Sequence, residues 1–268
     1  MKISVSNIAW DSIFDESVSS MLFQEQIKYI DLAPTKYVEN INELDRTLCK
    51  KITDFWLEKN ISFLGMQSLF YGKNELNIFD EDNFKNVMSH CEKLISIASM
   101  FKIKVLIFGS PLNRFIKNKN KNNNLIAKNF FNEFSKQIEQ TDITLCIEPN
   151  PKEYGCNFLT NTIECIDFVK ELNLPNVKTN LDLSAVQINN ENLLDVVKYG
   201  EKYFGYVHIS DPYLTPLENI IFHENSAKVI KSKLNPEIIS LEVNQSQVTD
   251  IKELQNSIKL VKELYSHE

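Results

Sequence analysis

Residues 143–150 read ITLCIEPN, a short apolar run that ends in a glutamate, a proline and an asparagine. An apolar run of this length, closed at once by turn residues, is typical of a strand buried on both faces of a parallel sheet. Three later segments repeat the pattern, and each has an acidic or imidazole side chain where its apolar run ends. These segments are NLDLS at 180–184, YVHIS at 206–210 and SLEVN at 240–244.

Apolar runs and helix-like stretches alternate along the whole chain on either side of these segments. The side chains that close the four runs stand 34, 26 and 34 residues apart, and each interval leaves room for a crossover helix: Glu148, Asp182, His208 and Glu242. Strands are predicted at 3–8, 27–32, 61–66, 104–108, 143–147, 177–181, 206–209 and 238–243. Eight strand–helix units with right-handed crossovers predict an α/β fold, the (β/α)8 TIM barrel, with residues 1–268 as a single domain.

The intervening segments carry helix signals. Between Asp82 and Met100, apolar residues recur every three or four positions, which predicts one apolar stripe. Asp250 and Glu253 form a capping-box pattern before the last helix. A doubly wound open sheet is the alternative, but it usually shows an early glycine-rich phosphate turn. The six glycines of this chain form neither that pattern nor a Walker motif, which also disfavours a nucleotide cofactor.

The composition narrows the class of protein. A net charge of −7 disfavours a nucleic-acid partner, because duplex binding requires a basic surface. No run approaches the roughly 18 apolar residues of a membrane span, and the start at Met1 leads into a strand rather than a secretory signal. The five cysteines form no Cys-x-x-Cys pair, which indicates a reduced, cytoplasmic protein without a disulfide framework.

The four strand-end side chains are expected to converge, because the carboxyl ends of barrel strands meet on the face that holds the chemistry. Carboxylate oxygens and an imidazole nitrogen suit a divalent cation such as Mn, Mg, Co or Zn. Without a cation, three neighbouring carboxylates would repel and at least one pKa would rise. A single acidic residue after a strand more often caps the next helix. Four ligand types at consecutive strand ends instead favour a metal site.

Several segments together resemble the xylose-isomerase-like barrel superfamily, whose members are often called sugar phosphate isomerases or epimerases. They are IEPN at 147–150, LD at 181–182, VHISD at 207–211, Glu242, and ASMFKIKVLIFGSP at 98–111. Ketose 3-epimerases, inosose dehydratases and dehydroshikimate dehydratases are all similar at the ligands. In the ketose 3-epimerases the residues that match Glu148 and Glu242 bind the metal and also move protons, so the resemblance implies catalytic roles for both. Barrels of this kind often pair, so a homo-oligomer is possible.

The chain also departs from those epimerases. Many members have a histidine three residues after the sixth-strand aspartate, where this chain has Ala185. The epimerases have an arginine soon after the seventh-strand histidine, but residues 209–217 contain none. A glutamate commonly lies six residues after the fifth-strand glutamate, where this chain has Tyr154. The departures leave the metal ligands in place and argue against a free ketose as the substrate.

The same fold includes apurinic-site endonucleases, which hold three zinc ions with many histidines. This chain has too few histidines for such a cluster: His90, His208, His223 and His267. The prediction is therefore a metal-dependent isomerase or epimerase of a sugar or sugar derivative. One carboxylate removes a proton beside a carbonyl, the cation stabilises the resulting ene-diolate, and a second carboxylate returns a proton. A metal-dependent dehydratase and a non-catalytic sugar-binding barrel remain as alternatives.

Further side chains near the predicted strand ends are candidates for contact with a carbohydrate substrate. A lysine or arginine could bind an anionic group, an aromatic ring could wall the pocket, the amides could bind hydroxyls, and a histidine could close over the site from the seventh loop. These candidates are Lys36, Trp10, Asn150, Arg114, His223 and Asn244. Cys146 precedes Glu148 on the same predicted strand, and we expect its side chain to point outward to the helices.

Overall fold

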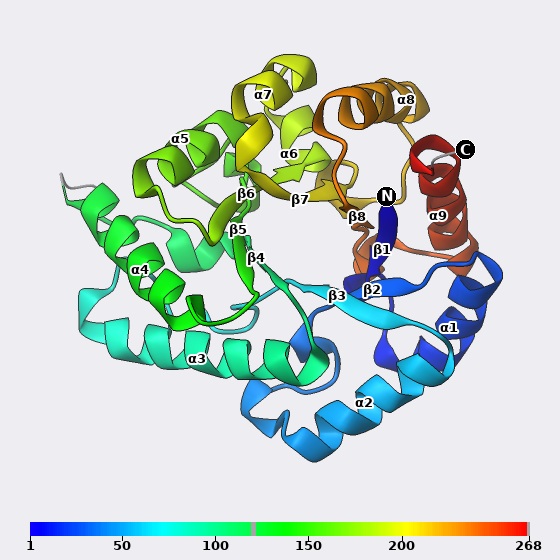
Figure 1. The fold of residues 1–268 in the computed structure, drawn as a ribbon, viewed down its shortest axis with the longest axis horizontal. Helices are drawn as coiled ribbons and strands as arrows, with labels where there is room; N and C mark the ends of the chain where they lie inside the picture. The colour runs from blue at the N-terminus through cyan, green and yellow to red at the C-terminus, as the bar shows by residue number, and fades with distance from the viewer. Residues whose placement is uncertain (119–121, 267–268) are drawn as a thin grey trace.

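The strands of the protein close into a parallel barrel in chain order, in a computed structural model that describes residues 1–118 and 122–266 (Figure 1). Because β1 pairs with both β2 and β8, the ring has no open edge. The strands are β1 (Lys2–Ser6), β2 (Tyr29–Leu32), β3 (Ser62–Met66), β4 (Val105–Phe108), β5 (Thr144–Ile147), β6 (Val177–Asp182), β7 (Phe204–Ile209) and β8 (Ile238–Leu241). The predicted single-domain (β/α)8 TIM barrel is confirmed.

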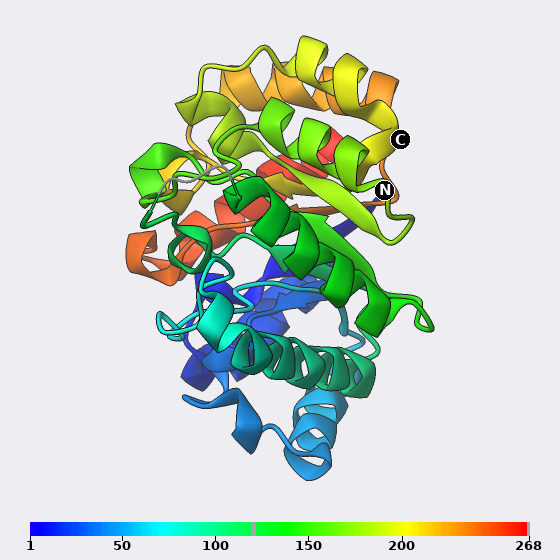
Figure 2. The same cartoon turned by 90° about the vertical axis from the view of Figure 1, so that its left-hand side faces the viewer.

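Helices surround the barrel and connect its strands (Figure 1). They are α1 (Asp15–Gln24), α2 (Arg46–Glu58), α3 (Phe84–Phe101), α4 (Asn123–Ile138), α5 (Thr162–Leu172), α6 (Leu183–Ile188), α7 (Leu193–Gly200), α8 (Ile220–Val229) and α9 (Ile251–Tyr265). Both termini lie on the right in Figure 2, at the end of the barrel where β1 begins. The loops that follow the strands lie at the opposite end.

The predicted helix signals are confirmed. In α3, Val87, Met88, Cys91 and Ala98 of the apolar stripe are buried against the barrel. The capping box is present at α9, where the Asp250 carboxylate accepts a backbone N–H and the Glu253 side chain accepts one in return. Such caps satisfy backbone donors that would otherwise lack partners at a helix start.

The observed strand boundaries differ from the prediction by up to two residues. β7 begins at Phe204, two residues earlier than predicted, and a register shift between Thr179 and Asn180 leaves Gly205 as an extra residue opposite β6. A Cβ on Gly205 would lie 2.8 Å from Cys146 Sγ, so the strands approach closely there. This bulge sets which side chains of β7 face the interior after it.

The barrel interior is polar below its mouth. Asp31 is fully buried and accepts hydrogen bonds from the Ser4 hydroxyl (2.7 Å), the Gly65 N–H (3.0 Å) and the Tyr206 hydroxyl (2.8 Å). A Cβ on Gly65 would lie 3.0 Å from Asp31 Cγ, a tight contact that the glycine avoids. The apolar core therefore lies mainly between the strands and the helices.

The prediction that Cys146 points outward is wrong. Its side chain packs with Val105, Ile107 and Tyr206, and the Tyr206 hydroxyl reaches Asp31 in the interior. Strand side chains alternate between faces, so Cys146 must lie on the same face as Glu148, two residues later.

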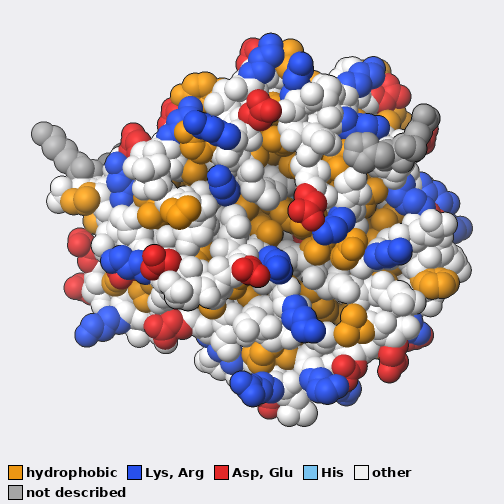
Figure 3. All heavy atoms as spheres, viewed as in Figure 1, with side chains coloured by type: hydrophobic (Ala, Val, Ile, Leu, Met, Phe, Trp, Pro, Cys, Tyr) orange, Lys and Arg blue, Asp and Glu red, His pale blue; other side chains and the backbone are white. Residues whose placement is uncertain are grey.

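On the face shown in Figure 3, charged side chains of both signs are interspersed. Two ion pairs form at the end of the barrel where the strands begin, between Lys2 and Glu237 (2.6 Å) and between Lys104 and Asp142 (3.1 Å). Among the described residues, no helix combines the length and the apolar character needed to cross a membrane.

Candidate metal centre

The predicted ligands stand at one end of the barrel because their strands end there. Glu148 and Glu242 are the first residues after β5 and β8, Asp182 is the last residue of β6, and His208 lies near the end of β7. In the register of the sheet, His208 is opposite Asp182 on one side and opposite Ser240 on the other. The sequence pattern and the parallel register together bring side chains from four strands to one level.

Three of the four predicted ligands form a tight cluster. One potential ligand atom from each of Glu148, His208 and Glu242 lies within 4.8 Å of the other two. His208 Nδ1 is 2.8 Å from Glu148 Oε1 and 3.2 Å from Glu242 Oε2. The imidazole is fully buried, and the two carboxylates are nearly so, with side-chain exposures of 13% and 9%.

The imidazole lacks ordinary hydrogen-bond partners among the described residues. Its contacts to the two carboxylates are short but do not have hydrogen-bond geometry, and neither ring nitrogen is otherwise satisfied. A buried nitrogen without a partner is costly. An imidazole nitrogen between two carboxylate oxygens matches the donor set that divalent transition metals prefer. The residues present therefore fit a dication.

The charges in the site support the same conclusion. Burial raises the pKa of Asp182 to about 8, and the nearby charges of Glu148 and Glu242 add to the rise. Burial alone would lower the pKa of His208, but the same two carboxylates raise it well above its usual range. Burial alone would also raise the pKa of Glu148, but the charge of His208 outweighs it and lowers that pKa. Protons thus compensate the excess negative charge when no cation does.

Asp182 lies outside the three-residue cluster. Its Oδ1 accepts the Ser184 N–H at 2.9 Å and also accepts the Ser210 hydroxyl. Asp182 is thereby the N-cap of α6, the ordinary role of an acidic residue after a strand. Its position beside His208 keeps it within electrostatic reach of both glutamates.

Two amide side chains that the sequence analysis did not identify hold the glutamates. Gln67 Nε2 donates to Glu242 Oε1 at 2.6 Å, and Asn180 Nδ2 donates to Glu148 Oε1 at 2.7 Å. Gln67 follows β3, and Asn180 lies two residues before Asp182 on β6. The alternation of strand side chains could have pointed to Asn180, because it shares a face with Asp182.

Arg114 and Asn150 lie behind Glu148 rather than beside its carboxylate. Arg114 is fully buried, and its Nη2 donates to the backbone carbonyl of Glu148 at 2.6 Å. Asn150 Nδ2 donates to the same carbonyl at 3.4 Å. Both side chains therefore fix the backbone at the end of β5.

Trp10 and Lys36 connect loops at the mouth of the barrel. Trp10 is buried, packs against Trp56 with ring centroids 6.1 Å apart, and donates from Nε1 to Asp15 at 2.7 Å. Lys36 Nζ donates to Gln245 Oε1 at 2.6 Å, which joins the loops after β2 and β8. Partial burial lowers the pKa of Lys36. Trp10 is thus a packing residue, whereas Lys36 remains half-exposed.

His223 and Asn244 hold the loops after β7 and β8. His223 is fully buried on α8, with its Nε2 3.0 Å from Asp211 Oδ1. Asp211 Oδ2 accepts the backbone N–H groups of Glu218 (2.7 Å) and Asn219 (3.2 Å). Asn244 Oδ1 accepts the N–H of residue 246 at 2.9 Å. His267, the last histidine of the chain, lies outside the described residues.

Tyr154 links three of the loops around the cluster. Its hydroxyl is 2.7 Å from Ser184 Oγ and accepts the Tyr213 N–H at 2.9 Å. Burial raises the pKa of Tyr154 to about 12, and the charges of Asp182 and Glu242 add to the rise. The hydroxyl is therefore a neutral group at physiological pH.

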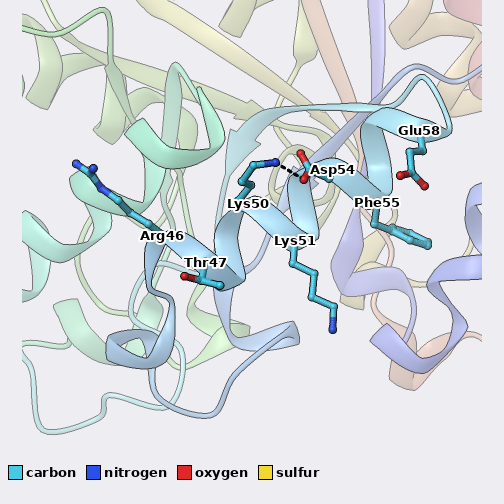
Figure 4. A pocket seen from close by; sticks show the side chains of 7 residues that line it. All are labelled: Arg46, Thr47, Lys50, Lys51, Asp54, Phe55 and Glu58. Carbon is cyan, nitrogen blue, oxygen red and sulfur yellow. Dashed lines mark hydrogen bonds and ion pairs between the residues drawn. The ribbon is translucent and has the colours of Figure 1, made fainter.

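A hollow elsewhere on the surface has a different character (Figure 4). All of its lining side chains come from α2, and most are exposed: Arg46, Thr47, Lys50, Lys51, Asp54, Phe55 and Glu58. In Figure 4 Lys50 and Asp54 point toward each other and form an ion pair, while the other side chains point in several directions. The strand-end cluster is the better candidate for a functional site.

Comparison with known proteins identifies the family of the chain. Residues 26–264 match the family model of the xylose isomerase-like TIM barrel, so the chain belongs to that family. A D-psicose 3-epimerase of Enterocloster bolteae is 26% identical over 137 residues, which are 49% of this chain and 45% of that protein. The match thus spans about half the length of that curated relative.

Two solved structures have the same fold over nearly their full length. The D-psicose 3-epimerase with D-tagatose from Clostridium cellulolyticum H10 is 14% identical and has a TM-score of 0.79, with 100% of each chain covered. The IOLI protein with a binding zinc atom is also 14% identical and has a TM-score of 0.73, with 99% of this chain and 98% of that chain covered. At these identities the similarity establishes the fold alone.

Gly109, directly after β4, gives Glu148 its space. A Cβ at this position would lie 2.4 Å from Glu148 Oε2, closer than real Cβ contacts allow. We expect Gly109→Ala to displace the carboxylate and weaken Mn²⁺ binding at least ~10-fold. Isothermal titration of the folded variant measures this. Wild-type affinity in a variant with unchanged circular dichroism would contradict the placement of Glu148 at the metal centre.

Asp211 predicts a pH dependence of stability. Burial alone would raise its pKa, but hydrogen bonds from His223, Gln187 and the Glu218 N–H lower the pKa to about 2. Its ordinary pKa is 3.8, so the stabilisation is complete above about pH 4 and is lost as the pH falls toward about 2. We expect Asp211→Asn to lower the free energy of unfolding by about 1–2 kcal/mol at pH 7, and by less at pH 3. Urea unfolding at both pH values tests this, and an equal loss at both would rule it out.

Proposed function

We propose that the protein is a divalent-metal-dependent isomerase or epimerase of a sugar or sugar derivative. The observation that carries the proposal is the buried cluster of Glu148, His208 and Glu242 at the mouth of the barrel. The membership in a family of barrels and the resemblance to D-psicose 3-epimerases support it. The five cysteines are buried and free, which is consistent with a reducing, cytoplasmic compartment.

The proposed metal ligands are Glu148, Asp182, His208 and Glu242. Burial favours the protonated form of Asp182 when no cation is bound. A metal would displace that proton, and the carboxylate of Asp182 would then join the other three ligands. A bound dication supplies Lewis acidity and a template for a carbonyl and an adjacent hydroxyl. The candidate metals are Mn, Mg, Co and Zn, and the zinc atom bound by the structurally similar IOLI protein fits this range.

The two glutamates are the proposed proton carriers. Glu148 follows β5 and Glu242 follows β8, so they reach the centre from different sides of the ring. A carbon-bound proton leaves to one carboxylate, and the other returns a proton to the opposite face, which inverts the carbon centre. General acid–base catalysis of this kind contributes typically about 10²–10⁴-fold to the rate.

The predicted substrate-binding residues fall into three groups according to what their side chains contact. Lys36 is the best placed for direct contact with an anionic substrate group, because it is only partly buried and its one hydrogen bond among the described residues goes to an amide oxygen, Gln245 Oε1. Asn150 and Arg114 act through the backbone of Glu148. The remaining candidates, Trp10, His223 and Asn244, shape the loops that would surround a carbohydrate.

Proton exchange with solvent tests the proposed chemistry. The Mn²⁺ or Co²⁺ form is incubated with a panel of sugars and sugar acids in heavy water, and carbon-bound deuterium is measured by mass spectrometry. We expect Glu148→Gln and Glu242→Gln each to reduce exchange by at least about 10²-fold. The exposed Glu58→Gln on α2 is the matched control and keeps full activity. No exchange with any substrate would contradict the isomerase proposal.

The same assay separates the alternatives. Formation of an unsaturated carbonyl product that absorbs ultraviolet light, with loss of water, would favour dehydration over epimerisation as the reaction. A sugar could instead stabilise both glutamate variants against heat while the wild type shows no proton exchange. That outcome would favour a non-catalytic sugar-binding barrel over an enzyme.

The loop residues predict a substrate preference. Tyr154, Ala185 and the arginine-free stretch 209–217 differ from the resemblance pattern of ketose 3-epimerases, and the Tyr154 hydroxyl is already engaged by Ser184 and Tyr213. We therefore expect kcat/KM on free D-psicose to be at least about 10²-fold below that on the true substrate. Tyr154→Glu combined with Ala185→His should narrow this gap. Efficient turnover of free D-psicose by the wild type would overturn the expectation.

A further inference from the structure

The carboxylates of Glu148 and Glu242 are held asymmetrically. Glu242 has both oxygens in contact, Oε1 with the Gln67 amide and Oε2 with His208. Glu148 uses a single oxygen, Oε1, for both Asn180 and His208. Within the described residues no hydrogen bond reaches Oε2 of Glu148, which lies over the space left by Gly109.

The two amides are oriented by the charges they face. Gln67 and Asn180 are buried, at 3% and 0% exposure, and each turns its NH₂ group toward a carboxylate. The opposite rotamer would place a carbonyl oxygen against a carboxylate oxygen, which repels. Their own oxygens, Gln67 Oε1 and Asn180 Oδ1, have no hydrogen-bond partner in the described structure. Leaving these acceptors unsatisfied is costly, so the hydrogen bonds to the glutamates must outweigh that cost.

We propose that Gln67 and Asn180 are positioning residues that each fix one oxygen of the paired glutamates, leaving Oε2 of Glu148 as the oxygen that takes the substrate proton. The assignment rests on the proposed function, both for the metal site and for the proton step. In that step the C–H bond beside the carbonyl breaks, the proton goes to Oε2, and the electron pair moves toward the carbonyl oxygen. Oε2 is the oxygen assigned to this step because Oε1 already accepts the Asn180 amide and lies against His208.

The arrangement also predicts how the two amides differ. Gln67 fixes the oxygen of Glu242 that points away from His208, so its loss frees the whole carboxylate to rotate. Asn180 binds Oε1 of Glu148, the oxygen that also faces His208. Loss of Asn180 therefore disturbs the position of Oε1 and also the direction in which Oε2 points. Loss of Gln67 therefore acts mainly on metal affinity, and loss of Asn180 acts on both affinity and kcat.

The test uses near-isosteric variants without donors, Gln67→Met and Asn180→Leu, in the full-length protein. Thr179→Val is the matched control, because Thr179 precedes Asn180 on β6 and its buried hydroxyl also lacks a partner, yet its side chain faces away from the site. Mn²⁺ dissociation constants are measured by electron paramagnetic resonance of the free ion. We expect increases of about 10–100-fold for both variants, as for other residues that orient metal ligands, and no change for the control.

The outcomes are distinguishable from failure of the proposed function. Weaker Mn²⁺ binding by the variants, without turnover of any substrate, would support the positioning roles of Gln67 and Asn180 while contradicting the isomerase proposal. Affinities within about twofold of wild type in folded variants would overturn the positioning roles whether or not the protein is an enzyme. With an active substrate, Asn180→Leu should lower kcat with little change in KM, and a pure KM effect would overturn the assignment of Oε2. If either variant fails to fold, Gln67→Ala and Asn180→Ala remove the donors without crowding the site.

Discussion

Burial of three carboxylates and one imidazole at the end of a closed barrel is the constraint on which the site depends. Charges of one sign in a buried place repel unless protons or a cation compensate them. The raised pKa values of Asp182 and His208 express that demand directly. The fully buried guanidinium of Arg114 adds a positive charge behind Glu148. A dication can compensate the same negative charge and also hold the ligand atoms in a defined geometry, which protons cannot do.

The interior below the site explains how the barrel tolerates so much polarity. Asp31 is satisfied by Ser4, Gly65 and Tyr206, so its burial does not leave free acceptors. Glycines make the space, since a Cβ on Gly109 would collide with the Glu148 carboxylate and one on Gly65 would crowd the Asp31 carboxyl group. The hydrophobic stabilisation instead comes from the layer between strands and helices, where residues such as Trp56 and Phe108 are fully buried. Chemistry and stability thus occupy different layers of the fold.

The fold could be predicted from sequence because buried parallel strands and amphipathic helices leave strong, repeated patterns. The cluster could be predicted because each ligand stands at the end of its own strand. Gln67 directly follows β3, so its strand-end position predicts a place at the mouth, but the role of Gln67 or Asn180 could not be predicted, since a lone amide has no characteristic spacing. Strict use of the two-residue period would have placed Asn180 beside Asp182 and Cys146 beneath Glu148. The bulge at Gly205 shows the limit of that rule, because an extra residue resets the period.

Loop residues were harder to assign, because proximity to a strand end fixes the backbone but not the direction of the side chain. His223 and Asn244 follow strand ends in the expected order, yet both are committed to loop contacts. Tyr154 shows the converse, since an aromatic residue in a loop reaches the neighbourhood of the cluster and joins Ser184 to Tyr213. The strands therefore fix the positions of the clustered side chains, and the loops fix which groups surround them.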